Sequence, residues 1–278
     1  MSGAPRPLRE CLELIASEIA EAAERPRREA ELILMAYLER DQLWLITHQE
    51  EPMTCDEGLE RMVARRKAHE PLEYIFNKVS FYSQLFYVAP GALIPRPETE
   101  LLIDRVLETV STEEMLTLCE VGVGSGAVSV VLAQALPKAR IIGVDISEDA
   151  LGVAARNVER FELEGQIELR RSDLLENVPE HVDVLVSNPP YVALDAPLER
   201  NLGYEPETSL FGGVTGMDII ERLMALVKER GIPVFCCEMG YDQREAVIAI
   251  VPNGYTAAFY EDLAGLDRGF VMRREKNH

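Results

Sequence analysis

The chain of 278 residues is poor in the residue patterns that mark metal-binding and disulfide-bonded proteins. Its five cysteines form no Cys-x-x-Cys pair, and adjacent Cys236 and Cys237 are poorly placed to bond each other. Only four histidines occur, and they are scattered, so no metal-ligand spacing is present. We therefore expect reduced thiols and no bound metal.

Long uncharged runs and basic residues are also scarce. No 18-residue stretch is free of charge, and the apolar run near the N-terminus carries acids, unlike a signal peptide. Lys and Arg number 28 against 48 Asp and Glu, which gives a net charge of −20. Nonspecific binding to nucleic acid or anionic lipid needs basic surface. We expect a cytoplasmic monomer with neither a membrane nor a direct nucleic-acid partner.

The sequence divides into three parts. Residues 1–76 are expected to form a small all-helical domain, because apolar residues recur at helical spacing and Pro26 and Pro52 mark helix boundaries. Alternating aromatic runs around Ser83 predict a β-hairpin linker over residues 77–97. Residues 98–278 open with a helix after Pro97 and then alternate short apolar strands with helices. This alternation predicts an α/β fold with a mostly parallel, doubly wound sheet. The seven predicted strands are Leu116–Val121, Arg140–Val144, Ile167–Arg170, Val182–Ser187, Pro233–Cys237, Tyr255–Tyr260 and Gly269–Arg273.

A glycine-rich turn follows the first of these strands. Gly122, Gly124 and Gly126 allow a tight turn that brings backbone close to a ligand at the N-terminus of the next helix. The following strand ends in Asp145, which is well placed to accept hydrogen bonds from two ribose hydroxyls. Strand, turn, helix, strand and acid in this order predict a nucleoside-binding site.

The glycine loop alone does not identify its ligand, because it also fits the dinucleotide-binding fingerprint. Glu120, two residues before the first glycine, would repel a pyrophosphate. A cationic cosubstrate such as S-adenosylmethionine would tolerate this carboxylate, which favours that cofactor over NAD. An NAD-dependent dehydrogenase remains an alternative, although it leaves the next motif without a purpose.

That motif is Asn188-Pro189-Pro190-Tyr191, directly after the predicted strand Val182–Ser187. In open α/β sheets, chemistry occurs beyond the carboxyl ends of the strands. The prolines restrict the backbone and offer no N–H, so the turn presents two acceptors, the Asn188 side-chain oxygen and the Pro189 carbonyl. Two fixed acceptors suit a planar NH2 group, and Tyr191 could form a flat wall over it. Such a group is a poor nucleophile, so catalysis would rest on position and electrostatics.

These motifs resemble those of class I S-adenosylmethionine-dependent methyltransferases, which have a Rossmann-like fold. More closely, the sequence is similar to the peptide chain release factor N5-glutamine methyltransferase family (the PrmC/HemK type). The similarity begins near Pro71 and covers nearly all of the chain beyond it. NPPY is shared with adenine and guanine amino-methylating enzymes, whereas Gly91–Glu100 and Tyr204-Glu205-Pro206 are more specific to glutamine methylation.

The resemblance implies a role for each motif. Asn188, Pro189, Pro190 and Tyr191 would hold the substrate glutamine amide, with Arg96–Thr99 beside the same pocket. The first domain would recognise a class-1 release factor, whose Gly-Gly-Gln glutamine is methylated by S-adenosylmethionine to leave S-adenosylhomocysteine. The cofactor would contact the following residues: Glu120, Gly122, Val123, Gly124, Ser125, Gly126, Asp145, Asp173, Leu174 and Asn188.

Three other functions compete with this one. A ribosomal-protein glutamine could be the substrate of the same amide chemistry, and an exocyclic amine of DNA or RNA could be methylated instead. The charge of −20 argues against the nucleic-acid substrate. A non-catalytic interaction module could retain the fold, but intact Asn188 and Asp145 argue for an enzyme. Glu205 is expected to brace the NPPY turn rather than to act as a base.

Overall fold

The computed structural model describes residues 5–197 and 200–275, and its contacts divide the chain into two compact units. The smaller unit contains residues 5–77 together with 200–204, and the larger contains 78–197 and 205–275. The segment 200–204, which ends in the 3-10 turn Leu202–Tyr204, was not anticipated in the first unit. The Tyr204 hydroxyl donates to the Ala68 carbonyl within that unit at 2.5 Å.

The smaller unit is helical, as predicted. Its core joins Ile15, Ile33 and Leu59 from three helices, all fully buried. Pro26 is the first residue of its helix, where its missing N–H costs nothing. Pro52 does break the helical pattern, but it also joins a two-residue antiparallel pair with Pro7. The elements are β1 (Arg6–Pro7), α1 (Leu8–Glu18), α2 (Pro26–Leu38), α3 (Gln42–Thr47), β2 (Pro52–Met53), α4 (Glu57–Lys67) and α5 (Leu72–Phe76).

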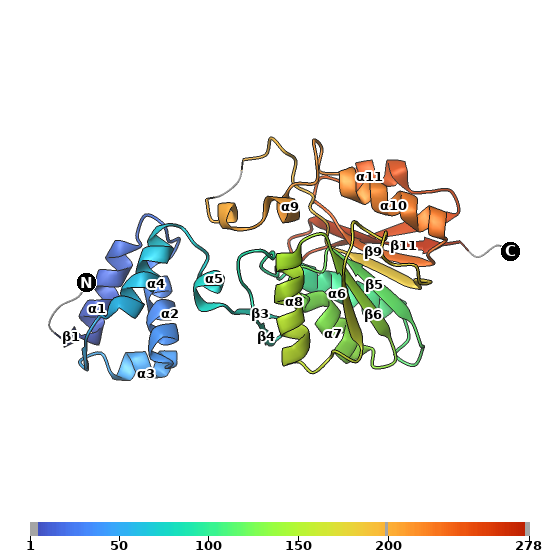
Figure 1. Ribbon diagram of the computed structural model, residues 1–278. Coiled ribbons are helices and arrows are strands. Elements are labelled where there is room, and N and C mark those ends of the chain that lie inside the picture. The colour runs from blue at the N-terminus through green and yellow to red at the C-terminus, as the bar shows by residue number, and fades with distance from the viewer. Residues whose placement is uncertain (1–4, 198–199, 276–278) are drawn as a thin grey trace. The chain divides into compact units, whose positions relative to one another are not determined.

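The larger unit is built on a seven-stranded sheet with the order β10-β11-β9-β8-β5-β6-β7 (Figure 1). All neighbours are parallel except β11, which runs antiparallel to both β9 and β10. The predicted fold class and the seven strands are confirmed. The strands are β5 (Thr117–Val121), β6 (Arg140–Asp145), β7 (Ile167–Arg171), β8 (Val184–Ser187), β9 (Val234–Glu238), β10 (Tyr255–Glu261) and β11 (Asp267–Arg274).

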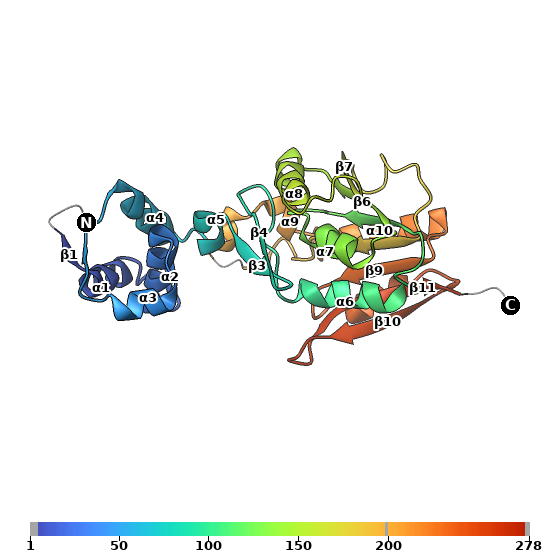
Figure 2. The ribbon, with the colours of Figure 1, turned by 90° about the horizontal axis from the view of Figure 1, so that it is seen from below.

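Helices cover both faces of this sheet (Figures 1 and 2). One apolar core lies on the side of α6 (Thr99–Thr109), α7 (Ala127–Ala135) and α8 (Glu148–Arg160). The other lies on the side of α10 (Asp218–Arg230) and α11 (Arg244–Ile250), while the short α9 (Glu207–Leu210) precedes them. The central strands β5, β6, β8 and β9 are buried on both faces, as parallel strands usually are, and therefore read as apolar runs.

The predicted hairpin is present as β3 (Val79–Phe81) and β4 (Gln84–Phe86). Its two turn residues, Tyr82 and Ser83, have φ angles of +49° and +59°, which non-glycine residues rarely adopt. The Tyr82 N–H donates to Glu100 at 2.7 Å and its hydroxyl donates to Asp104 at 2.9 Å, so α6 holds this turn. The adjacent phenylalanines, Phe81 and Phe86, are buried in the core of the larger unit.

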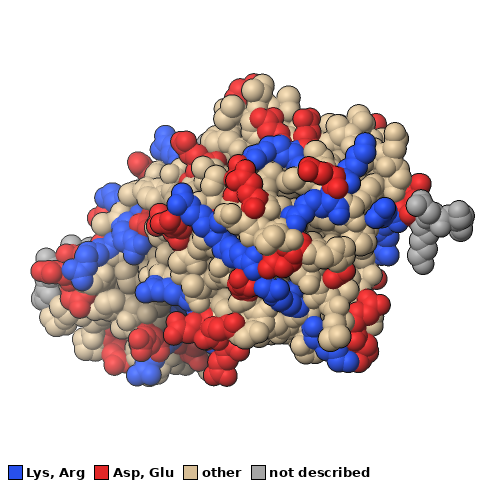
Figure 3. Space-filling view, turned by 45° about the vertical axis from the view of Figure 1, so that its right-hand side comes forward, with Lys and Arg blue, Asp and Glu red and all other residues tan. Residues whose placement is uncertain are grey.

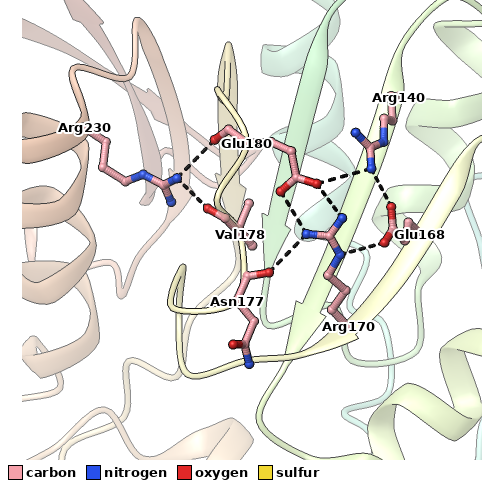
Figure 4. A network of polar contacts seen from close by, with 7 residues as sticks. All are labelled: Arg140, Glu168, Arg170, Asn177, Val178, Glu180 and Arg230. Carbon is pink, nitrogen blue, oxygen red and sulfur yellow. Dashed lines mark hydrogen bonds and ion pairs between the residues drawn. The ribbon is translucent and has the colours of Figure 1, made fainter.

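An ion-pair network ties the β6–β7 edge of the sheet to the loop after β7 (Figure 4). Arg170 donates to Glu168 at 2.7 Å and to Glu180 at 2.6 Å, and both acids also meet Arg140. Hydrogen bonds from these arginines hold the pKa of Glu168 and of Glu180 at about 2. Arg230 of α10 donates to the carbonyl of Glu180 at 3.1 Å. These contacts hold the loop between β7 and β8 in place near the end that leads into β8.

Replacing Phe86 should measure the hairpin's contribution to the core. Phe86→Ala should lower the free energy of unfolding by about 3–5 kcal/mol, because it removes a fully buried ring. Leu85→Ala on the same strand is the matched control, since Leu85 is 51% exposed and should cost less than about 0.5 kcal/mol. Urea denaturation followed by circular dichroism measures both, and equal losses would contradict burial of the hairpin.

Candidate active site

The glycine turn connects β5 to α7 at the carboxyl edge of the sheet. Gly122, Gly124 and Gly126 have φ angles of +75°, +53° and +78°, a conformation that L side chains rarely adopt. The N–H groups of Gly122 and Val123 both donate to the Val144 carbonyl of the neighbouring strand β6 at 2.9 Å. The turn is therefore fixed by the strand that carries Asp145.

Asp145 is the last residue of β6, and its carboxylate is held by backbone on both sides. Oδ2 accepts from the Gly124 N–H and Oδ1 from the Ser147 N–H, each at 3.0 Å. Burial raises the pKa of this carboxyl, and these hydrogen bonds oppose the shift. The side chain thus has a single orientation beside the glycine turn.

The NPPY turn leaves the sheet on the other side of the glycine turn, because β8 also pairs with β5. The Asn188 amide nitrogen Nδ2 donates to the Thr99 hydroxyl at 3.0 Å, which leaves Oδ1 as the acceptor on this side chain. The Pro189 carbonyl receives no hydrogen bond from the described residues. Both acceptors expected from the sequence are therefore available.

Distant glycines allow close packing behind the turn. A Cβ on Gly212 would lie 2.3 Å from the Pro190 carbonyl oxygen, and one on Gly216 would lie 2.2 Å from that of Tyr191. The Gln243 side chain donates to the same Tyr191 carbonyl at 3.1 Å. Only glycine fits at these two positions, which explains the Gly-Gly-Val-Thr-Gly sequence after α9.

A cavity of about 360 Å³ joins the two motifs. All of the site residues predicted from the sequence line it except Gly126 and Tyr191. At Gly126 a Cβ would lie 3.2 Å from Ala154, so this glycine allows α7 and α8 to pack closely. Tyr191 lies half-buried, with its hydroxyl donating to Glu238 at 3.2 Å. The cavity is also lined by residues that had no individual cofactor role: Leu93, Pro95, Thr99, Pro206, Phe211 and Arg222.

Two predicted residues lie on the anchored loop after β7. Both oxygens of Asp173 accept from Arg222 of α10 at 2.9 Å. Leu174 is buried against the core with a φ of +47°, and it reaches the cavity wall. The sequence did not signal the Arg222 contact, because the two residues are 49 positions apart.

Glu205 lies beneath the segment that precedes α6. It pairs with Arg96 and accepts from the Ile94 N–H at 3.0 Å, with only 5% of its surface exposed. Glu205 was expected to brace the NPPY turn, but its direct contacts are with Ile94 and Arg96, so it braces the segment that leads into Thr99. These contacts are the structural basis of the paired Gly91–Glu100 and Tyr-Glu-Pro motifs.

Asn157 supports the glycine turn from outside the cavity, a role that the sequence did not reveal. It is fully buried on α8, where its Nδ2 donates to the carbonyls of Ser125 and Tyr87 and its Oδ1 accepts from the Tyr87 N–H. The three distances are 2.8–2.9 Å. A polar residue on the apolar face of the helix, next to Val158, was the only available signal.

The acid Glu120 faces the cavity from β5. It is 3% exposed and accepts a hydrogen bond from the Ser129 hydroxyl of α7. Burial raises its pKa to about 8, and the hydrogen bonds from Ser129 only partly oppose this. A buried carboxyl in contact with a cavity suits a cationic ligand, because a cation would stabilise its ionised form.

Residues 5–197 and 200–275 contain neither a cluster of metal ligands nor a helix that could span a membrane. No group of three or more His, Cys, Asp or Glu side chains there could hold a metal ion. No helix in these ranges is both long and apolar enough to cross a membrane. All five cysteines are buried and free.

Comparisons with known proteins place these features in a family. Residues 10–76 match the PrmC N-terminal domain, and residues 97–200 match the methyltransferase small domain. A release factor glutamine methyltransferase of Koribacter versatilis is 40% identical over 258 residues, covering 90% of this chain and 91% of that protein. The chain belongs to the release factor glutamine methyltransferase family. A second member, from Moorella thermoacetica, is 34% identical over 269 residues and covers 92% and 94% of the two chains.

Solved structures support the fold of this family member. The human METTL16 catalytic domain in complex with an MAT2A 3′UTR hairpin aligns with a TM-score of 0.55 over 87% of this chain and 90% of that one. A ribosomal protein L11 methylase from Lactobacillus delbrueckii aligns with a TM-score of 0.50 over 68% and 84%. Identities of 12% and 18% make these similarities of fold alone.

Glu120 should make stability depend on pH. The folded state binds the proton of this carboxyl up to about pH 8, whereas the unfolded state releases it near 4.5. The free energy of unfolding should therefore fall as pH rises from 5 to 8, by about a few kcal/mol from this group. Urea denaturation without cofactor should show a smaller fall for Glu120→Gln. Exposed Glu164→Gln carries the same charge change and should follow the wild type. Parallel curves for wild type and Glu120→Gln would contradict the assignment.

Proposed function

We propose that this protein transfers a methyl group from S-adenosylmethionine to the side-chain amide nitrogen (N5) of the glutamine in the Gly-Gly-Gln motif of class-1 release factors. One observation carries the proposal: the acceptors Asn188 Oδ1 and Pro189 carbonyl adjoin the cavity that also contains the glycine turn and Asp145. Family membership supports the same conclusion, since its members from other organisms are named for this activity.

The residues around the cavity fit S-adenosylmethionine. The cavity volume of about 360 Å³ is within the usual range for small-molecule sites. The backbone of Gly122–Gly126 would bind the methionine end, and Asp145 would accept from the ribose hydroxyls. Asp173 and Leu174 would flank the adenine. Glu120 has no cationic side chain in contact among the described residues, and the cofactor's positive charge would supply one.

The NPPY turn would supply orientation for the substrate amide. An amide NH2 is planar, and its lone pair is delocalised into the carbonyl, so it attacks poorly. Hydrogen bonds from its two hydrogens to Asn188 Oδ1 and the Pro189 carbonyl would hold the nitrogen toward the cavity. They would also favour the positive charge that develops on nitrogen as the new bond forms. The cofactor, when bound, would provide the methyl group, whose bond to sulfur breaks as the N–C bond forms, and the amide nitrogen would release one proton to solvent.

A protein substrate fits this chain better than a nucleic acid. The net charge is −20, and on the face drawn in Figure 3 the basic side chains are interspersed with acidic ones. Nucleic-acid affinity depends largely on basic contacts with phosphates. The helical domain, residues 1–76, would recognise the release factor, and the hairpin segment 77–97 would link it to the methyltransferase domain, 98–278. We expect the enzyme to act in the cytoplasm as a monomer without a metal ion.

Methyl transfer to a purified release factor tests the proposal. The protein is incubated with S-adenosylmethionine labelled in the methyl group and with either the native factor or one whose Gly-Gly-Gln glutamine is alanine. Label on the native factor alone establishes the reaction and its site. Label on neither would overturn the release-factor substrate and would direct the search to ribosomal-protein glutamines.

Removal of the Asn188 amide should affect turnover rather than cofactor binding. Asn188→Ala should lower kcat by a factor on the order of a hundred, because one of two positioned acceptors is lost. Its Kd for S-adenosylmethionine, measured by calorimetry, should stay within about threefold of wild type. The exposed turn residue Asn253 gives the control Asn253→Ala, with unchanged kcat. Near-normal turnover in Asn188→Ala would refute the amide-holding role.

Asp145 should instead govern cofactor affinity. Asp145→Ala removes the proposed ribose acceptor and also frees the Gly124 N–H, so Kd for S-adenosylmethionine should rise at least about tenfold. Exposed Asp195→Ala is the control and should bind normally. Calorimetry at one pH and salt concentration compares the three proteins, and an unchanged Kd in Asp145→Ala would remove this carboxylate from the binding site.

A further inference from the structure

Glu238 is a buried acid at the carboxyl edge of the sheet, outside the residues that would contact the cofactor or the substrate amide. It ends β9, which pairs in parallel with β8 through Ser187 and Cys237. Asn188 follows Ser187 and Glu238 follows Cys237, so the acid lies beside the first residue of the NPPY turn. Glu238 does not line the cavity, so direct contact with the cofactor does not explain why an acid is buried here.

This carboxyl is buried away from bulk solvent. Glu238 is 2% exposed, and its Oε2 makes no hydrogen bond to any described residue. Its cross-strand partner is Gly269, which has no side chain. The Tyr260 ring of β10 fills that space, since a Cβ on Gly269 would lie 2.3 Å from the Tyr260 hydroxyl. A carboxyl buried in this way is costly to ionise and needs a reason to be there.

Two hydroxyl groups lead from Glu238 to the substrate-holding turn. The Tyr191 hydroxyl donates to Oε1 at 3.2 Å, and the Thr99 side chain lies near enough to the carboxyl to lower the pKa of Glu238. Thr99 Oγ1 already accepts from Asn188 Nδ2 at 3.0 Å, so the hydroxyl proton of Thr99 is free to point toward the acid. A carboxylate at Glu238 would favour the Thr99 hydroxyl that points toward it, and this direction leaves Thr99 Oγ1 to accept from Asn188 Nδ2.

We infer that Glu238 is a positioning residue for methyl transfer, whose carboxylate orients Tyr191 and Thr99 so that Asn188 presents Oδ1 to the substrate amide. The inference rests on the proposed function and extends it beyond the cavity. If Glu238 loses its charge, the Thr99 hydroxyl and the Asn188 amide are no longer held in one direction. An Asn188 side chain turned over would present Nδ2, a donor, to a substrate NH2 group that needs an acceptor.

The ionisation of Glu238 falls in the working range of pH. Burial raises its pKa to about 7, while the nearby Thr99 side chain and the hydrogen bond from Tyr191 oppose the shift. Other charged or titratable groups around it come from every neighbouring element, and they are Glu98 before α6, Arg268 on β11, Tyr260 on β10 and Cys237 on β9. Arg268 favours the carboxylate, and Glu98 disfavours it. The positioning carboxylate is therefore lost as pH falls through about 7, and kcat should fall with it.

Steady-state kinetics between pH 6 and 8.5 test this role with Glu238→Gln. At pH 8 its kcat should be about tenfold to a hundredfold below wild type, since small misplacement of a reacting group costs this much. The part of the wild-type pH profile with a midpoint near 7 should disappear, while Kd for S-adenosylmethionine stays unchanged. Glu261→Gln, an exposed acid at the end of β10, is the matched control and should keep the wild-type kcat and profile.

A double-mutant cycle with Tyr191→Phe separates positioning from general destabilisation. Tyr191→Phe should lower kcat, and adding Glu238→Gln should lower it by less than the product of the two single effects, because both changes break one hydrogen bond. Multiplicative effects would overturn the inference. So would a Glu238→Gln enzyme that keeps the wild-type kcat and pH profile.

A readout independent of turnover distinguishes failure of this inference from failure of the proposed function. The nine tyrosines are labelled with ¹³C at Cζ, and the Tyr191 signal is assigned by its loss in Tyr191→Phe. This signal should shift with a midpoint near pH 7 in the wild type and should not titrate there in Glu238→Gln. A titration without any methylation of the release factor would leave Glu238 linked to Tyr191 and refute only the substrate. A Tyr191 signal that does not titrate in the wild type would overturn the inference.

Discussion

The parallel pairing of β5 with β6 on one side and β8 on the other is the constraint on which the site depends. Val121 is in register with Val144 and with Ser187, so three strands end at one level of the sheet. The glycine turn and Asn188 directly follow β5 and β8, and Asp145 is the last residue of β6. A shift of one residue in either pairing would turn the following side chain to the other face and separate the two halves of the site.

A turn built on two prolines cannot hold itself, because neither residue donates a backbone hydrogen bond. The NPPY turn is therefore fixed from outside by segments that are distant in sequence. Thr99 binds the Asn188 amide, Gln243 binds the Tyr191 carbonyl, and Gly216 lets the backbone approach closely. These contacts leave the acceptors of Asn188 and Pro189 uncommitted. A turn that is held rigid by other segments, and whose own acceptors stay unused, suits a site that orients an amide by position alone.

Sequence patterns predicted what local chemistry determines: the seven strands, the glycine turn, the proline turn and the acid at the end of β6. They could not predict contacts set by tertiary register, such as Asn157 with Ser125 or Thr99 with Asn188. The Tyr82–Ser83 turn also departs from the usual turn residues, because α6 stabilises it from outside. The assignment of 200–204 to the smaller unit depends on long-range packing, for which the sequence carries no periodic signal.

Two buried acids flank the proposed reaction, and their surroundings divide their tasks. Burial raises the pKa of both, to about 8 for Glu120 and about 7 for Glu238. Glu120 faces the cavity, so a bound cation would restore its ionised form regardless of small changes in pH. Glu238 lies behind the NPPY turn, out of reach of the cavity, and only hydroxyl groups and distant charges stabilise its carboxylate. Cofactor binding would therefore change the ionisation of Glu120. Solution pH would change the ionisation of Glu238 and, through it, the orientation of the substrate amide.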